Sequence, residues 1–150
     1  MNRCGACSLG LLLVCGCGLF AKPACEILPI DDAVVVLSQN AQQRDLGMNG
    51  CIYEIEIPYL SLAVTPPQDF TKSGFAARKQ AAQETGAKVK EEPGIGSASF
   101  SIVTKDAEAI YVVQGSSAFS IILSNPGSST PLPDLMSKIR EVARRAVSRL

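Results

Sequence analysis

The chain of 150 residues contains no histidine and no tryptophan. Histidine is the usual side chain for proton transfer near neutral pH and the commonest metal ligand, so its absence excludes Ser–His and Cys–His nucleophiles. Aromatic residues make up only 5% of the chain, and 14 basic residues balance 14 acidic ones. Without net charge or aromatic platforms, we expect no binding to nucleic acid. The length is typical of one domain with an ordinary core.

A long hydrophobic run is also missing from the start of the chain. The apolar run Leu9–Val14 is far shorter than the ~20 residues needed to span a bilayer. It follows a short basic start with Arg3 and precedes small residues, which is the pattern of a secretory signal. A buried helix of a cytosolic protein fits less well, because Gly and Cys crowd both ends of the run. We therefore expect export.

Two processing sites compete in this region. Val14-Cys15-Gly16-Cys17 resembles a bacterial lipobox, which predicts a signal over residues 1–16 and a lipidated, palmitate-bearing Cys17. The alternative is a cut after Ala21, giving a signal over 1–21, although Leu19 is not the small residue expected there. We prefer the lipoprotein, anchored to a membrane and facing the periplasm or cell surface. The alternative is a soluble periplasmic or secreted chain.

Either cut explains the six cysteines. Cys4, Cys7 and Cys15 leave with the signal, and Cys17 leaves or carries lipid, so Cys25 and Cys51 remain as an unmodified pair. In an oxidising compartment such a pair is expected to form a disulfide. The remaining cysteine patterns, Cys4-Gly5-Ala6-Cys7 as a redox motif and Cys4, Cys7, Cys15 and Cys17 as a metal site, lack the structural context for either chemistry. We expect no metal and no cofactor.

The pattern of the remaining chain predicts one α+β domain over 29–150 after a tether over 17–28. A helix is expected near 27–38, although its three valines also suit a strand. Alternating apolar residues predict strands over 51–57, 60–65, 98–102, 109–114 and 118–124. Helices are expected over 69–84 and 133–150. The sequence thus predicts an antiparallel sheet of about five strands, covered by two or three helices, with one disulfide.

The order of these features resembles the DUF3558 family of uncharacterised exported bacterial lipoproteins. The resemblance rests on Cys25-Glu26-Ile27-Leu28, on Cys51-Ile52-Tyr53 and on the turn from Pro93 to Phe100. It covers most of residues 25–150, with Pro29 where the family usually has a capping Thr. The resemblance implies an envelope lipoprotein with a bonded cysteine pair and no assigned catalytic residues.

Two motifs invite a catalytic or ligand-binding interpretation. Pro93-Gly94-Ile95-Gly96 looks like a phosphate loop, but a strand follows it instead of a helix, so we expect a plain glycine turn. The acidic pairs are Asp31–Asp32, Glu54–Glu56 and Glu91–Glu92. Glu54 and Glu56 share a strand face and could act as acid and base. Their alternation with apolar residues instead predicts an exposed face. We assign no catalytic residue.

The last helix has an apolar stripe between two basic edges, formed by Lys138, Arg145 and Arg149 and by Arg140 and Arg144. Core packing is the preferred interpretation of the stripe, with contact to a membrane surface as the alternative. Glu141 and Arg145 are spaced to pair. We expect a non-catalytic envelope lipoprotein that binds or scaffolds, with an envelope protein as a possible partner. The alternatives are a secreted binding or inhibitor module and a small carboxylate-dependent hydrolase.

Overall fold

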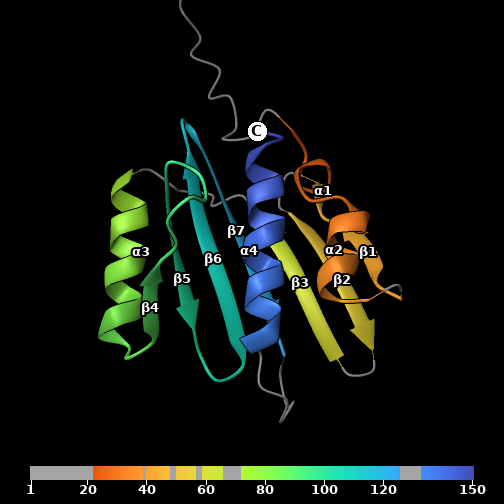
Figure 1. The fold of residues 1–150 in the computed structure, drawn as a ribbon, viewed down its shortest axis with the longest axis horizontal. Coiled ribbons are helices and arrows are strands. Elements are labelled where there is room, and N and C mark those ends of the chain that lie inside the picture. Colours follow the sequence, from red (N-terminus) through yellow and green to blue (C-terminus); the bar gives the residue numbers. More distant parts are fainter. Residues whose placement is uncertain (1–21, 39, 48–49, 57–58, 66–71, 126–132) are drawn as a thin grey trace, which may run out of the picture.

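We describe the protein from a computed structural model, in which residues 22–38, 40–47, 50–56, 59–65, 72–125 and 133–150 are described. The expected signal, both processing sites and Cys17 lie outside these residues. Within them the chain forms four helices and one seven-stranded sheet (Figure 1). The predicted α+β class, with an antiparallel sheet, covering helices and one disulfide, is confirmed.

Two short helices open the domain, α1 (Ala24–Ile27) and α2 (Ile30–Val36). The helix expected near 27–38 is α2, and Pro29, whose fixed φ suits a helix start, precedes it. The valine run is helical because burial of Ala33 and Val36 on one face outweighs the strand preference of valine. Ala24, Ile27 and Leu28 are buried in the core. The tether predicted over 17–28 is therefore wrong for residues 24–28, which belong to the folded domain.

The sheet is antiparallel throughout, in the order β1-β2-β3-β7-β6-β5-β4. The first three strands, β1 (Gln42–Asp45), β2 (Cys51–Glu56) and β3 (Tyr59–Thr65), follow one another. The chain then crosses through α3 (Lys72–Glu84) to the far edge. From there β4 (Lys88–Glu91), β5 (Ala98–Val103), β6 (Ala107–Gln114) and β7 (Ser117–Ser124) return to pair with β3.

The strands that the sequence did not predict are the two edges, β1 and β4. Their sequences, Gln-Gln-Arg-Asp and Lys-Val-Lys-Glu, are polar, and their side chains are mostly exposed. An edge strand with charged side chains discourages pairing with another chain, and it carries no apolar alternation for a sequence pattern to detect. The prediction of about five strands was short by these two.

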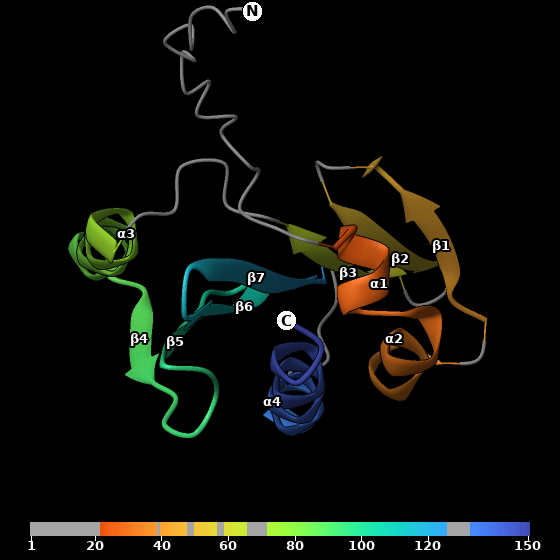
Figure 2. The same ribbon diagram turned by 90° about the horizontal axis from the view of Figure 1, so that it is seen from above.

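Helices cover both faces of the curved sheet, as Figure 2 shows. On one face α1, α2 and the last helix, α4 (Pro133–Val147), form the main core with Tyr53, Phe119 and Ile110. On the other face Phe75 of α3 packs edge-on against Phe100, which stacks on Tyr111. This contact places α3, within the helix predicted over 69–84, on the sheet.

Candidate functional site

Helix α4 buries the apolar stripe that the sequence indicated. Met136, Ile139, Val142, Ala143 and Ala146 are buried in the main core. This confirms core packing, and the alternative in which the stripe faces a membrane is wrong. The arginines beside the stripe reach acidic side chains on both sides of the helix, so α4 also supplies the counter-charges of the core.

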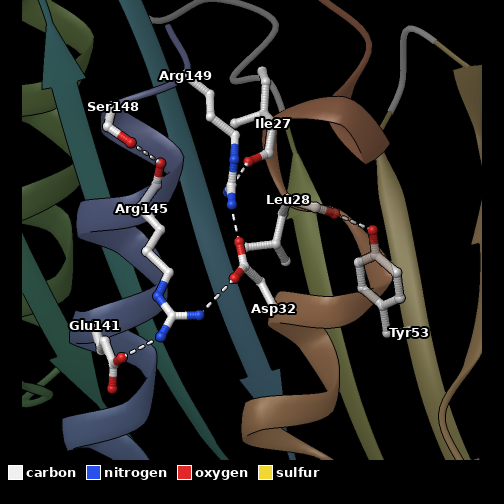
Figure 3. Close-up of polar contacts among 8 residues, drawn as sticks. All are labelled: Ile27, Leu28, Asp32, Tyr53, Glu141, Arg145, Ser148 and Arg149. Atoms are coloured by element: carbon white, nitrogen blue, oxygen red, sulfur yellow. Dashed lines mark hydrogen bonds and ion pairs between the residues drawn. The ribbon is translucent and has the colours of Figure 1, made fainter.

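On one side of α4, Asp32 of α2 is buried between two arginines (Figure 3). Arg145 Nη1 donates to Asp32 Oδ1 at 2.9 Å, and Arg149 Nη1 lies 2.5 Å from Asp32 Oδ2. Arg149 also donates to the carbonyl of Ile27 at 3.0 Å. Arg145 pairs with Glu141, as predicted from their spacing. The cluster joins α4 to α1 and α2.

Beside this cluster the hydroxyl of Tyr53 donates to the carbonyl oxygen of Leu28 (Figure 3). Tyr53 is fully buried on β2. Burial, followed by the negative charges of Asp45 and Asp32, raises the pKa of Tyr53 to about 12. Tyr53 therefore stays neutral at any physiological pH and acts as a structural donor that fixes the α1–α2 connection to the sheet.

On the other side of α4, Arg140 forms two hydrogen bonds with the buried carboxylate of Glu92. Nε lies 2.7 Å from Oε2 and Nη2 lies 2.8 Å from Oε1. Ser101 Oγ of β5 donates to the same Oε1 at 2.8 Å. Burial by itself would raise the pKa of Glu92, but these hydrogen bonds and the charge of Arg140 lower it below its ordinary value. Glu92 is thus an ionised carboxylate committed to an ion pair.

Glu108 on β6 is the buried acid that sequence reasoning missed. Its side chain is 4% exposed, and its Oε2 accepts no hydrogen bond from any described residue. Burial raises the pKa of Glu108, and the positive charge of Arg140 opposes the rise in part. The sequence did indicate this burial, because Glu108, Ile110 and Val112 occupy every second position of β6 and so share one face of the strand. A carboxyl held in this way binds a proton more readily than an exposed one.

Four acids of the pairs chosen from the sequence each contact a basic residue: Asp32, Glu54, Glu91 and Glu92. Glu54 is partly exposed and lies 3.4 Å from Arg44 of β1, while the side chain of Glu56 lies outside the described residues. In the pair Asp31–Asp32, Asp32 is buried in an ion pair with Arg145. In the pair Glu91–Glu92, Glu92 is buried in an ion pair with Arg140. Glu91 is exposed and pairs with Lys79 of α3.

The turn from Pro93 to Ser97 is a glycine turn, as predicted. Gly94 and Gly96 have positive φ angles of 81° and 65°, and Ile95 between them is buried in the main core. A Cβ at Gly96 would lie 2.5 Å from the carbonyl oxygen of Val113. The glycine is therefore required for close approach to β6 and not for phosphate binding.

The predicted disulfide joins Cys25 of α1 to Cys51 of β2. Cys51 is fully buried and packs in the main core with Ile27 and Leu28. The bond fastens the start of the described chain to the sheet across 26 residues of sequence. Its location makes the disulfide a structural brace.

A surface hollow of about 610 Å³ lies between the α3–β4 turn and the β5–β6 turn. This volume is within the range of pockets that hold small molecules, roughly 300–1,000 Å³. The hollow is lined by Thr85, Gly86, Ala87, Lys88, Val103, Thr104 and Lys105. Lys88 is the first residue of β4 and Lys105 lies in the β5–β6 turn, and both side chains are exposed. The two lysines give the hollow a positive lining.

Among the described residues, no three His, Cys, Asp or Glu side chains are placed to hold a metal ion. No helix in the described part of the chain is long and apolar enough to cross a bilayer. No family model, curated protein or solved structure matches the chain. The resemblance to the DUF3558 family therefore stays a prediction.

Proposed function

We propose that this protein is a non-catalytic lipoprotein of the bacterial envelope, anchored through Cys17, whose domain binds or scaffolds. The observation that carries the proposal is the Cys25–Cys51 disulfide, which lies just after the predicted anchor and braces the start of the domain. Disulfides form and persist in oxidising compartments such as the periplasm, and they are rare in the cytosol. A short tether that leads into a covalently fixed helix suits a domain held at a surface.

The use of the buried acids supports a non-catalytic role. Asp32 and Glu92 each contact arginines of α4, and these contacts join the helix to the rest of the domain. Removing the arginines from such an acid would leave a buried charge without a partner, so these acids have a structural use in the fold. Glu108 has a raised pKa, but its side chain is only 4% exposed, on the face of β6 that it shares with Ile110 and Val112.

Among the described residues, the hollow between the α3–β4 and β5–β6 turns offers a place for a small ligand. Its two lysines favour a group that carries a carboxylate or a phosphate. The secreted binding module remains the second candidate, since it would use the same hollow without an anchor. The hydrolase alternative has less support, because Glu54 is partly exposed and lies beside Arg44.

Intact mass of the protein, expressed in a bacterium with its own signal, tests the anchor and the disulfide. We expect a chain from Cys17 with diacylglycerol and acyl groups, and two thiols that react only after reduction. A chain from Lys22 without lipid would favour the secreted module. An unprocessed chain with free thiols would overturn the proposal.

Binding at the hollow is tested by amide chemical shifts during titration with small carboxylates and inorganic phosphate. We expect saturable shifts at Thr85–Lys88 and Val103–Lys105 that disappear in the K88Q/K105Q double variant. The matched control is K90Q, which removes an exposed lysine from the same edge strand but outside the hollow. Shifts that are equal in all variants would refute binding at this place.

A further inference from the structure

We infer that the end of the domain formed by α1, the C-terminal end of α4 and the β6–β7 turn faces the lipid surface. The opposite end, with the hollow, then points away from the membrane. The inference rests on the proposed anchor at Cys17 and identifies which surface that anchor holds against the lipid.

The first step is that the chain leaves the domain at a fixed point. Lys22 Nζ donates to the carbonyl oxygen of Arg149 at 2.6 Å. The carbonyl oxygen of Pro23 accepts from the backbone N–H groups of Glu26 and Ile27, at 3.0 Å and 3.2 Å, and starts α1. The disulfide then ties Cys25 to β2. Lys22 is therefore held at the end of the domain where α4 finishes.

The second step is the length of chain between anchor and domain. Lys22 follows Cys17 by five positions. Even fully extended, five residues span at most about 18 Å. The lipid surface therefore lies within this distance of Lys22, whose side chain contacts the carbonyl oxygen of Arg149 just beyond the end of α4.

The third step is that the hollow lies at the other end of the strands. In Figure 1, α1, the C-terminal end of α4 and the β6–β7 turn lie at the top, while the α3–β4 and β5–β6 turns lie at the bottom. The eight residues of β6 separate the two ends, and a strand of this length spans about 27 Å. Because the tether is shorter than the strand, the domain cannot stand inverted, with the hollow on the lipid and Lys22 a full strand length above it.

The exposed side chains near the tether suit a surface that lies beside headgroups without inserting. They include Lys22, Ser116, Ser148 and Leu150, of which Leu150 is apolar and 38% exposed. Arg145 and Arg149 are paired with Asp32. Since these described side chains present little apolar area and few unpaired charges, we attribute the orientation to the short tether and not to affinity for lipid.

The test places a fluorophore at either end of β6 in the lipidated full-length protein. S116C labels the β6–β7 turn and K105C the β5–β6 turn, both exposed positions where substitution is tolerated. The lipidated variants are reconstituted in vesicles of phosphatidylcholine and phosphatidylglycerol that carry a nitroxide on some headgroups. Because the two positions differ in height by about the length of the strand, we expect quenching at least about twofold stronger at position 116 than at 105.

A control variant carries about 20 Gly/Ser residues inserted between Gly18 and Leu19, which gives a flexible tether. We expect this insertion to remove most of the difference between the two positions. Equal quenching in the lipidated protein with its natural tether would overturn the orientation but leave the proposed function intact. A difference that persists in the long-tether variant would also overturn the tether as its cause. A mass that shows no lipid at Cys17 would overturn both the orientation and the proposed function.

Discussion

The guanidinium of Arg140 and the carboxylate of Glu92 form a two-bond ion pair across 48 residues of sequence. The carboxylate is buried, and the Arg140 side chain is 27% exposed. The pair joins the middle of α4 to the chain that follows β4. The attraction within such a buried pair adds little net stability, because it is offset by the loss of hydration of both charges. Removing only one partner is costly, because the other charge is then buried without a counter-charge.

Removal of one partner of this pair is therefore expected to be more harmful than removal of both. We expect R140M to lower the free energy of unfolding by about 2–3 kcal/mol, because Glu92 loses its counter-charge inside the domain. The double variant E92L/R140M should recover at least about half of this loss. Urea denaturation at pH 7 measures both values. A double variant that loses the sum of the two single effects would contradict this account.

The pH dependence of stability should have opposite slopes on the two sides of the ordinary glutamate pKa of 4.5. Glu92 has a lowered pKa in the folded state, so its contribution is present above 4.5 and is lost as the pH falls through the folded value. Glu108 has a raised pKa, so above pH 4.5 the unfolded chain releases the Glu108 proton while the folded state still holds it. Stability therefore falls as the pH rises from 4.5 and stops falling once the pH has passed the folded value. Denaturation of the wild type and of E92Q and E108Q across this range separates the two. E92Q should flatten the pH dependence of stability below pH 4.5 only, and E108Q should flatten it above pH 4.5 only.

The variant E108Q should be more stable than the wild type at pH 7. It replaces a buried carboxyl whose ionisation is disfavoured by burial and whose Oε2 accepts no hydrogen bond from the described residues. We expect a gain of about 1 kcal/mol, reduced by the lost attraction to Arg140. The control E91Q changes an exposed glutamate and should differ from the wild type by less than about 0.5 kcal/mol. Destabilisation by E108Q would show that Glu108 has a partner that supports its charge.

The two glycines of the Pro93–Ser97 turn should respond differently to alanine. At Gly96 the added Cβ would meet Val113 O at 2.5 Å and Val112 Cγ1 at 2.8 Å, in addition to the positive φ. We expect G96A to cost about 3 kcal/mol and G94A, which has open space, about 1 kcal/mol. Thermal unfolding of both variants measures the difference. Equal losses would show that the backbone angle alone matters.

Removal of the disulfide should destabilise the domain without changing its fold. The bond closes a loop of 26 residues, so the chain-entropy model gives a loss of about 3.5 kcal/mol for C25A/C51A. The wild type in the presence of reductant should show a similar loss. The midpoint in urea, with circular dichroism as a check on the fold, measures the effect. An unchanged midpoint would contradict the role of the bond as a brace.

Much of the architecture was predictable because buried apolar residues recur in the sequence with the period of the helix or strand that carries them. Cys51, Tyr53 and Ile55 alternate on β2, and the stripe of α4 repeats with the helical period. The edge strands β1 and β4 carry no such pattern, since neither of their faces is well buried. For the same reason α1 was taken for a tether, because four residues are too few to show a period.

The sequence by itself determined the class of fold, the disulfide partners and the requirement for glycine in the Pro93–Ser97 turn. These features follow from local pattern and from counting residues. The tertiary structure decided which charges meet: Asp32 with Arg145 and Arg149, and Glu92 with Arg140. It also decided that Glu108 is buried and that the hollow lies at the end of β6 away from Lys22. The reason is physical: ion pairs and burial depend on distances between residues far apart in the chain, and no periodicity in the sequence encodes those distances.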